Sequence, residues 1–263
     1  MVLTAPDGLR RRFLALAGSK SMASTLLRTE ALHFTRNGDG IKTYAAWLRR
    51  DERLPAVITI HDVHGLSDHY CDIARRLANE GFFALALDLY SREGAPALPD
   101  MDAVLAWLRQ LNDRQVLADI DGAVRFLGSR PEVRSRSIGI VGFCMGGRYA
   151  FMAACAVRNL AACASFYGML RSADRSQSPL TMAAELSCPF LGLFGEQDTL
   201  IPRADIKELE SILRRNGKTF STKIYREAGH AFFNDERPDA YRPETAKDAW
   251  TRVVGFLHTH LGA

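Results

Sequence analysis

Short apolar runs alternate with amphipathic stretches along most of the chain. Runs typical of buried strands lie at 56–61, 82–89, 137–143, 162–168, 189–195 and 220–226. Stretches with helical spacing separate or follow them, at 68–80, 101–111, 115–129, from 145 onward, 203–215 and 244–261. Strands that are apolar on both faces and separated by helices predict an α/β fold with a mostly parallel sheet covered on both sides.

Before this alternation begins, two strand-like runs at 31–36 and 40–49 flank the sequence Asn37-Gly38-Asp39-Gly40, which predicts a β-hairpin. One α/β domain over residues 28–263 accounts for the whole pattern. Two apolar stripes at helical spacing are interpreted as core faces: Val104, Leu105, Leu108 and Leu111, and Leu117, Ile120, Val124 and Leu127.

The composition mainly excludes kinds of partner. The 263 residues are 47% hydrophobic and 24% charged, which suffices for a sizeable core. The formal net charge of +4 is spread over interleaved acidic and basic residues, so a nucleic-acid partner is not expected. No stretch approaches the roughly 18 apolar residues of a membrane span, so we expect a soluble protein without a membrane partner.

Residues 1–27 are expected to be an N-terminal extension. They contain "LRRRFLALAG" and "SKSMAST", a twin-arginine-like run followed by an apolar segment and small residues, as in an export signal. The apolar segment is shorter than the roughly 7 to 15 residues of a signal core. We expect a cytoplasmic protein, and export through this segment is the alternative.

Five cysteines, at positions 71, 144, 155, 163 and 188, show no metal-type spacing, and their odd number argues for a reducing compartment. Cys144 stands out within "IVGFCMGGRY", residues 140–149. A phosphate-binding loop would need lysine and a hydroxyl residue where Arg148 and Tyr149 stand. A cysteine-phosphatase loop would need arginine at Ala150. The other four cysteines are interpreted as buried hydrophobic residues.

A nucleophile elbow fits this stretch better. Its strained strand-to-helix turn requires almost no side chain two positions before and after the nucleophile, and Gly142 and Gly146 flank Cys144 in this way. Such a turn places the thiol at the amino end of a helix, where the thiolate is favoured. It also directs the N–H of Met145 to the place where an oxyanion would form.

A nucleophile needs a base, and the base needs an orienting acid. In elbow hydrolases the chain order is nucleophile, acid, histidine. Asp198 and His230 follow late strands in this order, and Glu196 is the alternative acid. All three belong to the segments that follow predicted strands, where chemistry gathers in such sheets: "HDVHG", "DLYSR", "GFCMGG", "FYG", "GEQD" and "AGHAFF".

From about residue 28 to the end, the chain resembles the dienelactone hydrolase family, the carboxymethylenebutenolidases. The resemblance is carried by "GFCMGGRY", "GEQD", "AGHAFFND", "DLYSR" and "HDVHGLSDHY". It implies an α/β-hydrolase fold in which Cys144 is the nucleophile, His230 the base and Asp198 its orienting acid. It also implies that Val63 supplies the second oxyanion N–H.

The resemblance breaks at two positions. Asp62 replaces a glutamate that contacts the resting cysteine in the family, so a longer or water-mediated contact is expected. Arg92 matches one of two arginines that bind the substrate carboxylate, but Asn234 stands at the second position. We therefore expect weaker recognition of anionic lactones and easier entry of neutral esters.

A metal site at His61, His64 and His69 is less favoured, because these histidines straddle a turn and have no second cluster. We expect a hydrolase that cleaves a small-molecule lactone or ester through a thiol-acyl intermediate, without metal or cofactor, as a monomer or small homo-oligomer. The alternatives are a non-catalytic ligand-binding protein of the same fold and a thiol redox sensor.

Overall fold

The computed structural model describes residues 27–172 and 177–262. Except for Leu27, the N-terminal extension expected over residues 1–27 lies outside the described residues. The strands are β1 (Leu27–Arg36), β2 (Asp39–Leu48), β3 (Leu54–Ile60), β4 (Phe83–Leu87), β5 (Val133–Phe143), β6 (Ala162–Phe166), β7 (Phe190–Gly195) and β8 (Phe220–Tyr225). The helices are α1 (Asp68–Asn79), α2 (Met101–Gln110), α3 (Asp113–Ser129), α4 (Met145–Ala156), α5 (Pro179–Met182), the 3₁₀ helix η1 (Ala183–Glu185), α6 (Arg203–Arg215) and α7 (Pro243–Leu261).

All eight strands form one sheet in the order β1-β2-β4-β3-β5-β6-β7-β8. The pairs β1/β2 and β2/β4 are antiparallel, and the other pairs are parallel. The predicted hairpin is confirmed: β1 and β2 meet at Asn37 and Gly38, which both have positive φ, as the tight turns of hairpins require. The predicted fold class is confirmed as well.

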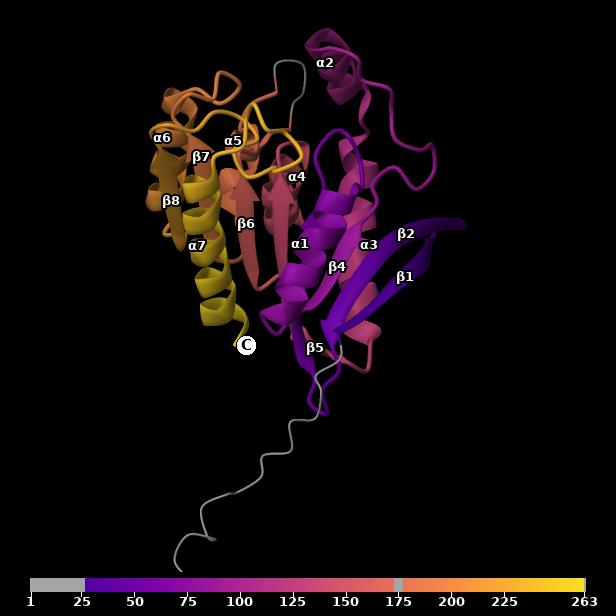
Figure 1. Ribbon diagram of the computed structural model, residues 1–263. Helices are drawn as coiled ribbons and strands as arrows, with labels where there is room; N and C mark the ends of the chain where they lie inside the picture. Colours follow the sequence, from indigo (N-terminus) through magenta and orange to yellow (C-terminus); the bar gives the residue numbers. More distant parts are fainter. Residues whose placement is uncertain (1–26, 173–176, 263) are drawn as a thin grey trace, which may run out of the picture.

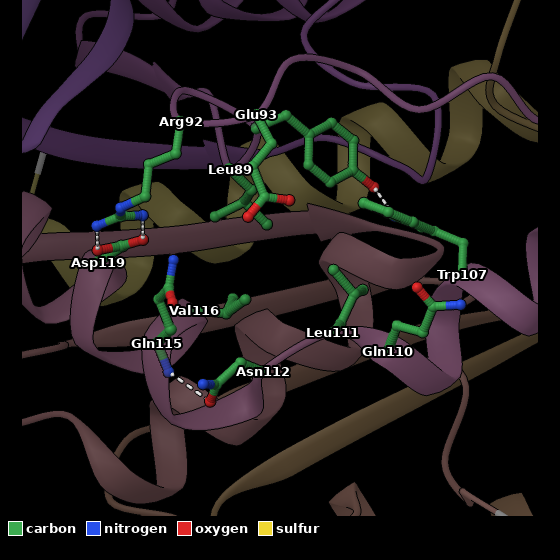
Figure 2. Close-up of a pocket in the computed structure, with 11 residues that line it drawn as sticks. Leu89, Arg92, Glu93, Trp107, Gln110, Leu111, Asn112, Gln115, Val116 and Asp119 are labelled. Carbon is green, nitrogen blue, oxygen red and sulfur yellow. Dashed lines mark hydrogen bonds and ion pairs between the residues drawn. The ribbon is translucent and has the colours of Figure 1, made fainter.

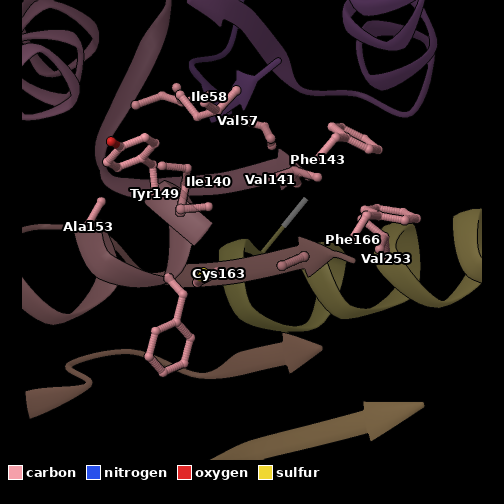
Figure 3. Close-up of a cluster of buried hydrophobic side chains, with 14 of the residues drawn as sticks. Val57, Ile58, Ile140, Val141, Phe143, Tyr149, Ala153, Cys163, Phe166 and Val253 are labelled. Carbon is pink, nitrogen blue, oxygen red and sulfur yellow. The ribbon is translucent and has the colours of Figure 1, made fainter. Parts of the chain in front are cut away.

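The central strands are buried on both faces because helices cover both sides of the sheet. Every residue of β3, β4, β6 and β7 is buried. Helices α1 and α7 lie on one face, and α3 and α4 lie on the other (Figure 1). Figure 3 draws part of this core, with Ile58, Ile140 and Phe143 from the sheet, Tyr149 from α4 and Val253 from α7.

The interpretation of both helical stripes as core is confirmed for α3 and only in part for α2. In α3, Ile120, Val124 and Leu127 are buried, while Leu117 packs against the core in a partly buried position. In α2, no residue is buried. Figure 1 shows α2 beyond the ends of the strands, where Val104 and Leu108 pack against the edge of the core in partly buried positions and Leu105 does not.

Candidate active site

Cys144 lies on a sharp turn between β5, which ends at Phe143, and α4, which begins at Met145. Its backbone has φ 54° and ψ −116°, a strained conformation for a residue with a side chain. The flanking glycines permit the turn. A Cβ on Gly142 would lie 2.0 Å from the carbonyl oxygen of Gly146, so β5 and α4 could not approach this closely with any larger residue.

We expect Gly146→Ala to lower the free energy of unfolding by more than about 3 kcal/mol, because overpacking against fixed atoms strains the backbone. The new Cβ would lie 2.3 Å from the carbonyl oxygen of Ile60 and 2.4 Å from that of His61. Urea denaturation measures the change. Gly255→Ala is the control, because nothing lies within 4 Å of its Cβ in α7. It should be neutral or stabilise by up to about 1 kcal/mol. Equal urea midpoints for Gly146→Ala and the wild type would contradict the tight turn.

Asp198 and His230 meet beyond the ends of β7 and β8. His230 Nδ1 lies 2.7 Å from Asp198 Oδ2, and the other carboxylate oxygen accepts the Leu200 N–H at 2.9 Å. Glu196, the alternative acid, instead pairs with Arg203 at the surface. The structure therefore brings Asp198, and not Glu196, to the histidine.

The environment of His230 favours its charged form. Burial lowers the pKa of His230, but the charge of Cys144 and the hydrogen bond to Asp198 outweigh burial and raise this pKa to about 10. Within the described part of the chain, His230 Nε2 is buried and has no hydrogen-bond partner. Cys144 and His230 line the same cavity, of about 240 Å³. His230 can thus hold a proton next to Cys144.

Val63 lines this cavity, and Met145 directly follows Cys144 in the chain. Val63 follows β3 and lines the cavity, and its carbonyl accepts the Tyr90 hydroxyl at 3.0 Å. Met145 is the first residue of α4, and its sulfur lies 3.5 Å from the same hydroxyl. No hydrogen bond is found from the N–H of Val63 or Met145 to another described residue. Both N–H groups remain available to a bound oxygen.

Asp62 is buried next to this loop. Its carboxylate accepts the backbone N–H of His64 at 2.9 Å, and the described residues show no hydrogen bond between Asp62 and Cys144. Burial, followed by the charge of Asp62, raises the pKa of Tyr70 and of Tyr167 well above the ordinary value. The charge of Asp62 therefore acts on two buried phenols, and a longer or water-mediated contact between Asp62 and the thiol stays a prediction.

The structure does not bring Arg92 or Asn234 to this cavity, contrary to the expectation that they face the substrate. The Arg92 guanidinium binds both oxygens of Asp119 at 2.7 and 3.0 Å and also binds Asp39 at 2.5 Å. It lines a separate cavity of about 170 Å³ (Figure 2). Asn234 is buried and accepts the N–H of Glu236, so it stabilises a turn. The charge of Arg92 is thus neutralised by nearby carboxylates, and the amide oxygen of Asn234 accepts a hydrogen bond within its own turn.

Arg237 is the cation that does line the cavity, and the sequence reasoning missed it. Its backbone N–H donates to the Asn234 carbonyl. The loop that carries it is fastened to α1 by Glu236, which accepts the Ser67 hydroxyl and the His69 N–H, both at 3.1 Å. No carboxylate of the described residues pairs with its guanidinium. No motif in the sequence marked this position, because it lies outside the histidine motif.

Tyr167 was also missed as an individual residue, although "FYG" was among the candidate segments. Among the residues that the structure describes, five non-glycine residues have positive φ, and two of them are asparagines, which adopt it readily. The other three are Cys144, Tyr167 and Ala231, and all lie at this site. The Tyr167 ring lies 5.1 Å from the His230 ring, measured between centroids. Backbone strain is thus concentrated around the Cys144 and His230 side chains.

The three histidines of "HDVHGLSDHY" have separate roles. His61 Nε2 accepts the Leu89 N–H at 3.0 Å, and His61 Nδ1 lies 2.6 Å from the Asp62 carbonyl. This buried histidine therefore joins the ends of β3 and β4. His69 binds Asp235, while His64 lines the cavity.

Within the described ranges, no group of three or more His, Cys, Asp or Glu residues could hold a metal ion. No helix in these ranges is long and apolar enough to cross a membrane.

Comparison with known proteins identifies the family of this chain. Residues 41–261 match the model of the dienelactone hydrolase family. A Bradyrhizobium protein assigned by name as a 2-oxo-3-(5-oxofuran-2-ylidene)propanoate lactonase is 36% identical over 91% of this chain and 98% of its own. An Escherichia coli K12 protein assigned by name as a carboxymethylenebutenolidase is 35% identical over 92% of this chain and 93% of its own.

A solved structure extends the agreement to the fold. A chain from Klebsiella pneumoniae, titled as a dienelactone hydrolase, superposes with a TM-score of 0.83 and 32% identity. The match covers 88% of this chain and 98% of that chain. The chain therefore belongs to the dienelactone hydrolase family and is a hydrolase of the α/β-hydrolase fold.

Proposed function

We propose that this enzyme hydrolyses a carboxylic ester or lactone through a thioester on Cys144. The observation that carries this proposal is the meeting of three groups in one cavity. Cys144 stands on a strained turn at the start of a helix, His230 lines the same cavity, and Asp198 holds His230 Nδ1 at 2.7 Å. A nucleophile, a base and an orienting acid suffice for acyl transfer.

In the first half of the reaction, the Cys144 sulfur attacks the carbonyl carbon, and the thiol proton rests on His230 Nε2. The N–H groups of Met145 and Val63 hold the negative oxygen of the tetrahedral intermediate. The carbon–oxygen bond to the leaving group then breaks, and His230 gives its proton to the departing oxygen. Cys144 is left as a thioester.

In the second half, His230 takes a proton from water, and the hydroxyl oxygen attacks the thioester carbonyl. The carbon–sulfur bond breaks, the acid product leaves, and the proton returns to the Cys144–His230 pair. Asp198 holds the imidazole so that Nε2 faces the reaction in both halves. The step needs no group beyond the described residues and water.

Trapping the thioester tests this mechanism. The enzyme is mixed with an excess of p-nitrophenyl ester, quenched in acid, digested and analysed by mass spectrometry. We expect the acyl group on the peptide that contains Cys144. Burial raises the pKa of Cys155 and Cys188 to about 12, so these thiols should stay unmodified. Turnover with the acyl group on another residue would contradict the proposal.

We further propose that Arg237 binds an anionic group of the substrate. The Bradyrhizobium relative is named for a lactone that carries a carboxylate, and Arg237 is a cation without a carboxylate partner among the described residues. A guanidinium binds a carboxylate through charge-assisted hydrogen bonds, which are the strong ones. The substrate class would then be a lactone or ester with a carboxylate near the reacting group.

Arg237→Gln should lower kcat/KM for an anionic dienelactone by about 10- to 100-fold relative to a neutral aryl ester, as the loss of a charged hydrogen bond would. The ratio of the two kcat/KM values is the measurement. Arg92→Gln is the matched control, because Arg92 is bound by Asp119 and lies outside this cavity. If Arg92→Gln changes the ratio and Arg237→Gln does not, anion binding by Arg237 is wrong.

A further inference from the structure

Helix α2 directs its apolar side chains into the cavity of Cys144. Met101, Val104, Leu105 and Leu108 all line this cavity of about 240 Å³. None of them is buried, and Met101 is 53% exposed. In Figure 1, α2 stands at the top of the molecule, beyond the strand ends. Part of the apolar surface of α2 thus borders the cavity that contains Cys144.

The helix is held in place by contacts on its other sides. Asp100 accepts the Ala103 N–H at 2.8 Å and caps the first turn. Trp107 donates its indole N–H to the Tyr90 hydroxyl at 3.1 Å, and the two rings meet edge to face at 5.9 Å. The same hydroxyl binds the Val63 carbonyl, so α2 is joined to the loop beside Cys144. The apolar wall therefore has a fixed position relative to the thiol.

Two further apolar side chains, Met169 and Leu200, also line the cavity. Apolar walls facing open space gain free energy only when something apolar displaces the water between them. The reacting group must sit at Cys144 in this cavity, so the group that fills the remaining space belongs to the same molecule. The volume of the cavity, about 240 Å³, corresponds to roughly eight water molecules at about 30 Å³ each.

We propose that the α2 face, with Met169 and Leu200, binds a hydrocarbon substituent of the substrate, so that the enzyme selects esters or lactones with a substituent of several carbons over their methyl counterparts. This inference rests on the proposed ester hydrolysis at the same site. Leu105 is the residue of choice for a test, because it lines the cavity without belonging to the buried core.

The first experiment measures how the rate of Cys144 modification depends on the alkyl chain length of the thiol reagent. Rate constants for Cys144 modification by methyl, butyl and hexyl methanethiosulfonate are measured for the wild type, Leu105→Asn and Ala106→Asn. Ala106 is exposed on α2 and does not line the cavity, so it controls for asparagine in this helix. We expect the wild-type rate to rise up to about fourfold per buried methylene, the same rise in Ala106→Asn, and a flat series in Leu105→Asn.

Hydrolysis of p-nitrophenyl acetate, butyrate and hexanoate is measured in parallel, and kcat/KM should follow the same order. Ala106→Asn should retain acetate hydrolysis within about twofold of the wild type, which shows that an asparagine in α2 leaves the catalytic groups in place. A wild-type series that is flat in both assays, or a Leu105→Asn series as steep as the wild type, would overturn the apolar-substituent proposal. Chain-length-dependent modification without hydrolysis of any ester would instead count against the proposed function alone.

Discussion

Replacement of Cys144 by alanine should lower kcat by about 10⁴-fold or more while the protein stays folded. Members of a catalytic triad act as a unit, and loss of the nucleophile leaves only the rate that binding and the oxyanion groups supply. Alanine is smaller than cysteine and the side chain is 9% exposed at a cavity wall, so the fold should tolerate it. The strained φ of 54° is already present in the wild type.

Initial rates with a dienelactone and a neutral aryl ester, together with circular dichroism, measure this effect. Cys155→Ser is the matched control: Cys155 lies at the end of the same helix, outside the cavity, and should keep kcat within about twofold of the wild type. If Cys144→Ala retained more than about a tenth of the wild-type rate, another residue would be the nucleophile. The position of Cys144 on the strained turn would then be explained by ligand binding without catalysis or by a redox role.

Asp198→Asn should lower kcat by about 10³- to 10⁴-fold, because an amide no longer holds the required tautomer of the histidine. The Asp198 carboxylate accepts His230 Nδ1–H, which leaves Nε2 free for the thiol proton. An asparagine can present its NH₂ group to Nδ1 and thereby place the imidazole proton on Nε2. The base is then unable to accept a proton.

The same variant has a pH signature. The charge of Asp198 and its hydrogen bond help to raise the pKa of His230 to about 10, so asparagine should lower that pKa. Since the folded pKa lies above the ordinary value near 6.5, the imidazolium form persists up to about pH 10 in the wild type and is lost at a lower pH in the variant. Iodoacetamide should therefore modify Cys144 of Asp198→Asn more slowly at pH 7.

Glu196→Gln serves as the control for both readouts, because Glu196 pairs with Arg203 at the surface and does not contact the histidine. It should leave kcat and the alkylation rate within about twofold of the wild type. A large loss of kcat in Glu196→Gln combined with an active Asp198→Asn would reverse the assignment of the acid.

Much of the site followed from residue order alone. The glycines around Cys144 predicted a strand-to-helix turn because a Cβ at either position would collide with backbone, and the structure has this turn. Asp198 and His230 followed strands that are neighbours in a parallel sheet, and such strands end at a common edge. Glycine sterics and strand direction depend on short stretches of the chain, so the features that follow from them can be predicted from the sequence.

Other features depended on contacts between segments far apart in the chain. The stripe of α2 has the same spacing as that of α3, and periodicity alone does not reveal whether an apolar face meets a sheet or an open cavity. Arg92 is held by Asp119, 27 positions away, and Arg237 reaches the cavity because Glu236 fastens its loop to α1. Tertiary packing decides which partner a charged side chain finds.

The sequence by itself therefore determined the α/β sheet, the strand-to-helix turn at Cys144 and the order of Cys144, Asp198 and His230 along the chain. These features depend on periodicity, glycine sterics and strand order, which act over short stretches or follow chain direction. Only the tertiary structure decided that α2 borders the cavity, that Arg92 is bound elsewhere and that Arg237 lines the cavity of Cys144. Those outcomes depend on competition among distant side chains for the same space and the same charges, and this competition is resolved only when the chain has folded.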